Sequence, residues 1–410
     1  MNPLLKEKCH INTNIGEDTF VGIKCHGEDF SVHFPLGFSL TQEENDKAVR
    51  KDILLLIEVL AAHCKRQDAE GNFLADEQTN TDSPLYAYIY IIRDFVARGY
   101  YKEGIVEYAS SKRGKINWNR TIKQKKPVIQ DTDVFYLDFI TKKNVINEND
   151  LITLIHQYCV YTSFIKIGWL FTDYKPPKPA IPFHRQWFSS ALMAKLNNTF
   201  NDNNKALFQN MLKIVREEPD KGLECTDYSY GTYSFEHTWE HMIDTVFGIA
   251  DKDRYFPRTQ WNLVRNNQLY DSTKLEPDTI MLYKDNIYVL DAKYYRYGWT
   301  KHAGDLPKSE SINKQITYAE YIDQQEELKS NNTELYNAFI MPFDKLQWAD
   351  EKAEHMHYIG EAVGLWKNSN KKYERIQGIL LDVKYLMQIA EKRSESDIMA
   401  LAEFIEEHCS

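Results

Sequence analysis

The segment of residues 276–293 constrains the fold of this chain more than any other. It contains two apolar runs that meet at Asp285 and Asn286, a pair suited to the two-residue turn of a β-hairpin. Both predicted faces are largely apolar, and a strand pair buried on both sides belongs inside a sheet that helices cover. Helical and apolar strand patterns alternate through the second half of the chain. The sequence therefore predicts an α/β (α+β) fold with a central mixed sheet flanked by helices.

Three charged side chains lie at one end of this predicted hairpin. With the turn at residues 285–286, Asp278 faces Lys293, and Asp291 stands two residues before that lysine. Because side chains alternate across a strand with a period of two, all three point to the same face. Two acids and a lysine are costly to bury unless they bind something. The arrangement favours a hard divalent cation held by carboxylate oxygens, with the lysine beside an attacking water or a phosphate.

A helix expected in the C-terminal half carries a competing motif. His237, Glu240 and His241 form an H-x-x-E-H string, the inverted motif of a class of zinc proteases, with the histidines one turn apart. On a helical wheel both histidines fall opposite the apolar stripe, whereas Glu236 and Glu240 lie at its edge. Either glutamate could supply a third acid to the hairpin site, and a zinc metalloprotease stays open as the alternative.

Charge is distributed unevenly along the chain. Lys and Arg number 50 against 60 Asp and Glu, a formal charge of −10 that disfavours bulk attraction to nucleic acid. Residues 108–130 nevertheless contain seven basic residues and no acidic one. A tryptophan inside this run favours an interaction surface for DNA or a partner over a solvated loop. The candidate contact residues are Lys112, Arg113, Lys115, Trp118 and Arg120.

A run of three prolines in residues 175–179 cannot lie inside a helix or a central strand, so it predicts a domain boundary. The expected domains are an α+β domain of residues 1–175 and an α/β domain of residues 176–410. No signal peptide, membrane span or disulfide framework is recognisable, which predicts a soluble cytoplasmic protein. Three adjacent cysteine–histidine pairs match no zinc-finger spacing and are expected to be core or surface residues.

Four segments occur in an order that resembles a known family: GKINWNRTI at 114–122, FEHTWE at 235–240, EPD and LDAKYY within 276–295, and INKQITYAEYI at 312–322. The chain resembles the LlaJI family of restriction endonucleases and is similar to the McrC nuclease subunit. The resemblance covers most of the chain. It implies a PD-(D/E)xK restriction-endonuclease-like core that hydrolyses DNA phosphodiesters with Mg²⁺, for which Mn²⁺ can substitute.

The resemblance also implies roles for individual residues. Asp278 and Asp291 would be metal ligands, and Lys293 would orient the water or stabilise the pentacovalent charge. The usual helix acid would be Glu236 or Glu240, between which the sequence does not choose. Gln315 matches the first member of a Gln-to-Tyr pair, although Tyr318 follows after three residues instead of the more common four. A purely packing role for that helix is the alternative.

A partner follows from the same resemblance, because McrC-like subunits work with a GTP-hydrolysing AAA+ motor similar to McrB. The sequence has no G-x-x-x-x-G-K-[ST] phosphate loop, so GTP is expected only on a separate polypeptide. Residues 1–175 would then form the motor-coupling domain, and residues 176–410 the nuclease domain that acts on double-stranded DNA. A non-catalytic adaptor of the motor is a further alternative, disfavoured because all three core residues are present.

Overall fold

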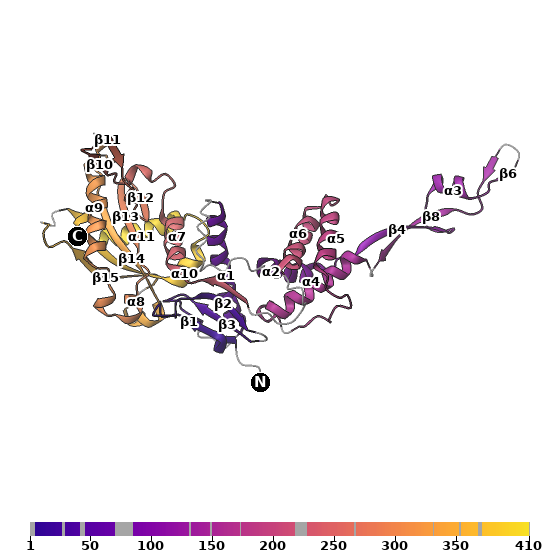
Figure 1. Cartoon of the computed structure of the whole chain (residues 1–410), viewed down its shortest axis with the longest axis horizontal. Coiled ribbons are helices and arrows are strands. Elements are labelled where there is room, and N and C mark those ends of the chain that lie inside the picture. The colour runs from indigo at the N-terminus through magenta and orange to yellow at the C-terminus, as the bar shows by residue number, and fades with distance from the viewer. Residues whose placement is uncertain are drawn as a thin grey trace. The chain divides into compact units, whose positions relative to one another are not determined.

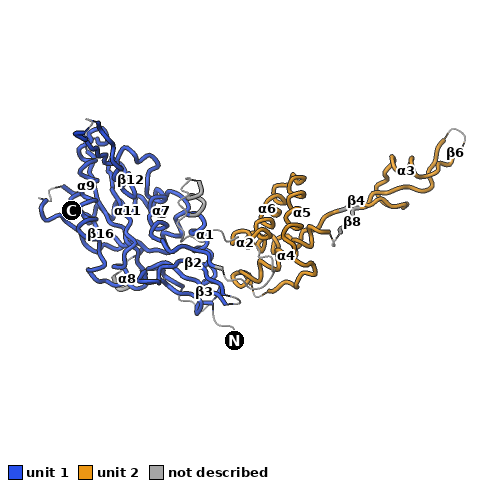
Figure 2. Tube along the Cα trace, in the orientation of Figure 1, with its two compact units in different colours: residues 1–81, 226–410 blue, residues 82–225 orange. Residues whose placement is uncertain are grey.

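The computed structural model divides the chain into two compact units, Met1–Thr81 with Thr226–Ser410, and Asp82–Cys225 (Figure 2). The expected boundary at residue 175 is corrected, because it lies inside the second unit and the first unit is built from both ends of the chain. The described residues are 5–26, 29–41, 46–69, 85–130, 133–147, 150–172, 174–217, 228–265, 268–330, 332–351, 354–367 and 371–409.

A four-stranded sheet joins the two ends of the chain in the first unit. Its order is β1 (Cys9–Ile11), β3 (Asp29–Phe34), β2 (Val21–His26) and β9 (Tyr228–Thr232), with β1 parallel to β3. Gly22 of β2 pairs with Gly231 of β9, and a Cβ atom on either would lie 2.1 Å from a carbonyl oxygen of the opposite strand. This glycine pair lets the strands approach closely, so residues before the second unit complete a sheet with residues after it.

The larger sheet of this unit is mixed and five-stranded (Figure 1). Its three interior strands are parallel to one another, and each edge strand is antiparallel to the interior strand beside it. Every residue of the central strand β14 is buried, as expected for a strand covered on both faces. This confirms the predicted mixed sheet with flanking helices. The order is β12 (Thr279–Tyr283), β13 (Asn286–Ala292), β14 (Leu335–Phe343), β16 (Arg375–Asp382) and β15 (Met356–Val363).

The turn between β12 and β13 is one residue earlier than expected. Tyr283 pairs with Asn286, so the turn residues are Lys284 and Asp285, and Lys284 has a left-handed φ of 52°. Asn286 starts β13 because its side chain donates to Glu406 (2.8 Å) and accepts from the backbone of residue 334. Continued beyond Thr279 and Leu290, the ladder places Asp278 opposite Asp291 instead of Lys293. The residue opposite Asp278 thus changes by two positions, from Lys293 to Asp291. Because side chains alternate with a period of two, all three charged side chains still point to the same face.

Helices cover both faces of the large sheet. Helix α9 (Ser309–Gln324) packs on one face through Ile316, Tyr318, Ala319 and Ile322. On the other face lie α7 (Phe235–Phe247) and α11 (Glu395–His408) (Figure 1). The α7 indole Trp239 Nε1 donates to the carbonyl oxygen of Ile340 in β14 at 3.3 Å, which ties that helix to the sheet.

Shorter elements complete the first unit. They are α1 (Asp46–Ala69), α8 (Tyr297–Thr300), α10 (Val383–Ile389), the hairpin of β10 (Gln260–Leu263) and β11 (Gln268–Asp271), and the 3₁₀ segments Leu5–Lys8, Asp253–Tyr255, Ala303–Asp305, Glu326–Leu328, Lys345–Glu351 and Lys372–Glu374.

The second unit is a helical bundle with an extended arm. The bundle contains α2 (Leu85–Arg98), α4 (Leu151–Ile167), the 3₁₀ segment Gly168–Leu170, α5 (Arg185–Asn197) and α6 (Asp202–Glu217). The arm, residues 103–147, is an antiparallel sheet of order β4 (Glu103–Ser110), β8 (Ile140–Asn147) and β5 (Lys115–Ile116), with α3 (Trp118–Gln124) and the hairpin β6 (Val128–Gln130) and β7 (Asp133–Phe135). Among the residues that the structure describes, no helix has both the length and the apolar character needed to span a bilayer.

Candidate active site

Asp278 and Asp291 meet at one end of the β12–β13 hairpin. Asp278 directly precedes β12, and its Oδ2 atom accepts a hydrogen bond from the backbone N–H of Ala292 at 2.9 Å. Lys252 fixes the same segment by donating to the Asp278 carbonyl oxygen at 2.7 Å. Asp291 is buried on the α9 face of the sheet, where its register partner in β14 is Phe339. The backbone therefore holds two carboxylates against each other in an apolar setting.

Lys293 is the third member of this cluster. Its Nζ atom lies 2.7 Å from Asp291 Oδ2, and the two side chains are 19% and 5% exposed. The Lys293 N–H donates to the carbonyl oxygen of Ile340 at 2.9 Å, which extends the ladder between β13 and β14 past the last residue of the strand. The ammonium group is thus carried on ordered backbone beside the carboxylate pair.

The surroundings of the cluster oppose ionisation of both carboxyl groups at once. Burial, followed by the charge of Asp291 and a hydrogen bond with its carboxyl group, raises the pKa of Asp278 to about 8. Burial alone lowers the pKa of the Lys293 ammonium, but Asp291 and Asp278 outweigh this effect and raise it. With both acids ionised, one lysine would not neutralise the site, so a bound cation would relieve the repulsion between the two carboxylates.

The two candidate glutamates of α7 have different surroundings. Burial raises the pKa of Glu240, and the charges of Lys293 and Asp291 also act on that pKa. Glu240 in turn contributes to the raised pKa of Asp278. The charge of Glu236 instead contributes to the raised pKa of Tyr294, the residue after Lys293, behind the larger effect of burial. Glu240 is therefore the glutamate that shares the electrostatic environment of the carboxylate pair.

Gln315 of α9 binds the backbone of β13 two residues before Asp291. Its Nε2 donates to the Val289 carbonyl oxygen of β13 at 2.7 Å and approaches Asn337 Oδ1 at 3.4 Å. Its buried Oε1 atom has no hydrogen-bond partner among the described residues. Tyr318 donates from its hydroxyl to the Glu276 carbonyl oxygen at 3.0 Å, so the three-residue spacing still fixes the chain just before Asp278.

Lys314 is a residue of this neighbourhood that the sequence reasoning missed. A hydrogen bond with Tyr318 raises the pKa of its exposed ammonium, and Asp291 and Asp278 act in the same direction. The available signal was its position four residues before Tyr318, which places both side chains on one face of α9.

The H-x-x-E-H string does not assemble a metal site within the described part of the chain. His237 is 59% exposed and faces Glu240 at 3.7 Å, whereas the His241 ring lies 5.7 Å from that of His63 and near the Thr245 hydroxyl. The group of histidine and acidic side chains that could hold an ion in those residues lies in the N-terminal sheet instead.

The basic candidates of the sequence lie on the arm of the second unit. Trp118 is 54% exposed and packs edge-on against the rings of Tyr136 and Phe139. The Arg120 guanidinium lies 3.7 Å from the centre of the Tyr108 ring. The side chains of all five candidates are exposed, namely Lys112, Arg113, Lys115, Trp118 and Arg120.

Two known proteins and one family profile match most of this chain. The type II restriction enzyme BsuMI component YdjA of Bacillus subtilis (strain 168) is 26% identical over 339 residues, which cover 79% of this chain and 72% of that protein. A chain of the refined half-complex from the tetradecameric assembly of Thermococcus gammatolerans McrB AAA+ hexamers with bound McrC matches with 14% identity and a TM-score of 0.38, covering 94% of this chain and 83% of that one. The profile of the LlaJI restriction endonuclease family matches residues 20–405, and the chain belongs to that family.

Proposed function

We propose that this chain is the Mg²⁺-dependent endonuclease subunit of a McrBC/LlaJI-type restriction system and hydrolyses phosphodiesters of double-stranded DNA. The observation that carries the proposal is the buried pair of Asp278 and Asp291 with Lys293 beside it. Membership of a restriction endonuclease family supports it. In this proposal the five-stranded sheet with its hairpin is a PD-(D/E)xK core.

The residues at the hairpin fit a hard divalent cation. Both candidate ligands are carboxylates, and Mg²⁺ is commonly bound by one or two carboxylates together with water and substrate phosphates. Burial and, after it, the charge of Asp291 raise the pKa of Asp278, and a divalent ion at the pair would favour the ionised form of that carboxyl group. Mn²⁺ has the same preference for oxygen ligands and would substitute. When bound, such an ion supplies Lewis-acid stabilisation of phosphoryl oxygens and lowers the pKa of water.

The other residues of the site would position the substrate and compensate charge. Lys293, held at Asp291, would place a positive charge where negative charge develops on the phosphoryl oxygens. Glu240 would be the helix acid of the core, since its pKa responds to the same charges. Gln315 would hold β13 in place through the Val289 carbonyl group, and its unpaired Oε1 atom could accept a further hydrogen bond.

We further propose that the arm binds a McrB-like AAA+ GTPase that supplies the GTP-hydrolysing activity. The arm combines exposed basic residues with exposed apolar side chains, a mixture typical of interaction surfaces. The similarity to YdjA, which is a component of a type II restriction enzyme, supports a multi-subunit system. The exposed apolar residues of the arm include Ile122, Ile129, Val134, Phe135 and Leu137.

Plasmid cleavage by the chain together with its motor subunit tests the nuclease proposal. After chelator treatment, Mg²⁺ or Mn²⁺ should restore cleavage, and Asp291→Asn or Lys293→Met should lower the rate by roughly 10²-fold or more. Asp285→Asn, an exposed turn variant, is the matched control and should cleave normally. Undiminished cleavage by Asp291→Asn would refute the nuclease assignment. Peptide hydrolysis that requires Zn²⁺ and His237 would establish the metalloprotease instead.

The partner proposal has its own test. Replacing Lys112, Arg113 and Lys115 together by alanine should weaken co-purification with the motor and lower motor-dependent cleavage. These side chains are exposed, so folding and metal binding should be unchanged. A triple variant that retains full motor binding would exclude this part of the arm as the contact surface.

A further inference from the structure

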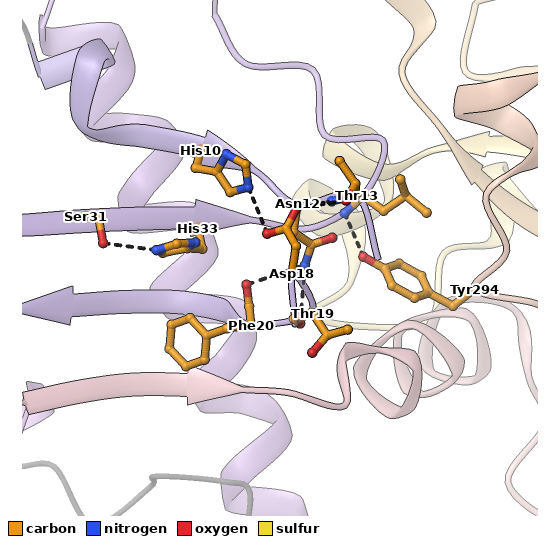
Figure 3. Close-up of polar contacts among 10 residues, drawn as sticks. His10, Asn12, Thr13, Asp18, Thr19, Phe20, Ser31, His33 and Tyr294 are labelled. Carbon is orange, nitrogen blue, oxygen red and sulfur yellow. Dashed lines mark hydrogen bonds and ion pairs between the residues drawn. The ribbon is translucent and has the colours of Figure 1, made fainter. Parts of the chain in front are cut away.

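A second group of metal-binding side chains lies in the N-terminal sheet of the first unit. His10 belongs to β1, His33 to β3, and Asp18 to the segment between β1 and β2. One potential ligand atom from each residue lies within 4.8 Å of the other two. Figure 3 shows the two imidazole rings and the Asp18 carboxylate gathered at one place.

The strand register brings the two histidines together. His10 and His33 are direct partners in the parallel pair β1–β3, so their side chains are neighbours on the same face of the sheet. Their ring centres are 5.4 Å apart. The adjacent backbone bond from Asn12 N–H to the Phe34 carbonyl oxygen continues this ladder toward the loop that carries Asp18.

A tight turn after β1 places Asp18 beside the two histidines. Asn14 and Gly16 have φ values of 52° and 55°, and Ile15 forms an antiparallel bridge with Asp18. The Asp18 Oδ2 atom accepts hydrogen bonds from the N–H and hydroxyl groups of Thr13 at 2.8 and 2.9 Å. The other oxygen, Oδ1, is thereby directed at His10 Nε2, 2.8 Å away.

Surrounding groups also orient the ring of His33. The Ser31 hydroxyl lies 3.0 Å from His33 Nε2, and the Phe20 ring packs against the imidazole at a T-shaped angle. A hydrogen bond at one ring nitrogen is typical of histidines that bind a metal through the other nitrogen. The positive charge of Lys24 would repel a cation bound at His33. The Lys24 ammonium itself lies over the Phe20 ring, 4.4 Å from the ring centre.

We propose that His10, Asp18 and His33 bind a divalent transition-metal ion of the Zn²⁺ class. Two imidazole nitrogens and one carboxylate oxygen form a ligand set that suits Zn²⁺ better than Mg²⁺. His10 and Asp18 are 49% and 31% exposed, so water can reach a fourth coordination position. The site differs in ligands and preferred ion from the pair at Asp278 and Asp291.

The location gives the ion a structural role. It would join β1 and the turn of residues 12–20 to β3, and Leu36 follows two residues after the end of β3. The Leu36 N–H donates to the Tyr294 hydroxyl at 2.7 Å, and Tyr294 directly follows Lys293. An ion at the histidines would therefore stabilise the segment that packs against the end of β13.

Metal binding by the chelator-treated full-length chain tests this proposal. Calorimetry with Zn²⁺ should detect one tight site, and Co²⁺ should give the intense visible absorption of a four-coordinate complex. His10→Ala and Asp18→Asn should each weaken this binding at least about tenfold and abolish the rise in Tm on adding Zn²⁺. Asp18→Asn retains an acceptor for Thr13, so it removes the charge while preserving the turn.

Two controls separate this site from other metal-binding groups. Asp278→Asn combined with Asp291→Asn should leave the tight Zn²⁺ site and the intense Co²⁺ absorption unchanged, although weaker binding at the hairpin is lost. His26→Ala, an exposed histidine of the adjacent strand β2, should also have no effect. The proposal is overturned if the wild-type chain binds neither ion, or if His10→Ala and Asp18→Asn bind both as tightly as wild type.

Discussion

At the residue scale, the pair of facing carboxyl groups is the most informative feature of the molecule. Asp278 and Asp291 repel each other in a buried setting, and Lys293 compensates only part of their charge. Such an arrangement opposes folding unless a ligand offsets it. Stability measurements without metal should therefore reveal the site independently of any activity assay.

The pH dependence of Asp278→Asn tests this repulsion. In the folded protein the Asp278 pKa is raised to about 8, so the folded state keeps a proton that the unfolded state loses above pH 4. Stability of the wild type should therefore fall between about pH 4 and pH 8. In EDTA, the variant should be more stable than wild type at pH 8, by at least about 1 kcal/mol, and similar to it at pH 4. Urea unfolding measures both, and an equal difference at the two pH values would contradict the prediction.

At the scale of single elements, the β12–β13 turn explains why the register differed from expectation. Asp-Asn was the plausible turn pair by composition, but the contacts of the Asn286 amide assign that residue to the strand. The left-handed position falls on Lys284, an unfavourable residue for it. Tertiary contacts therefore outweighed the local turn preference.

Glycine substitutions in this turn should have opposite effects. Lys284→Gly relieves the left-handed backbone and should raise the free energy of unfolding by roughly 0.5 kcal/mol, even with loss of the Lys284 contact to the Tyr283 ring. Asp285→Gly, at the adjacent position, should lower it by a similar amount because glycine adds entropy to the unfolded chain. Urea denaturation of both variants provides the comparison. Stabilisation by both would show that turn geometry is not the cause.

Helix α9 is attached to the hairpin by Gln315. Gln315→Met preserves the size of the side chain but leaves the Val289 carbonyl oxygen without this donor, so it should destabilise the protein by about 1–3 kcal/mol. Thr317→Ala, an exposed position of the same helix, is the control and should change stability by less than about 0.5 kcal/mol. If both variants unfold at the same urea concentration, the Gln315 bond contributes no net stability.

At the scale of the whole molecule, the N-terminal residues belong to the same unit as the hairpin site. Besides the pairing of β2 with β9, the Asp52 carboxylate is buried beside Lys384 Nζ at 2.7 Å, and the Ser39 hydroxyl donates to Asp344. These contacts join segments more than 300 residues apart. The second unit is therefore an insertion within the first one.

Fragments of the chain should reflect this organisation. The fragment 226–410 alone should fail to fold because β9 and the surfaces around Asp344 and Lys384 lose their partners. Co-expression with residues 1–81 should yield a soluble complex, whereas residues 82–225 should fold alone as a mainly helical unit. Circular dichroism and co-purification measure these outcomes. Cooperative unfolding of 226–410 by itself would show that the N-terminal segment is dispensable.

The sequence by itself determined the strand pair, the mixed sheet and the common face of Asp278, Asp291 and Lys293, because strand periodicity is a local property. It also carried the family signature. The tertiary structure alone decided the turn position, the nearness of Glu240 to the carboxylate pair, the two-unit division and the grouping of His10 and His33 with Asp18. Those features depend on contacts between segments distant in sequence, and no local pattern encodes which segments will meet.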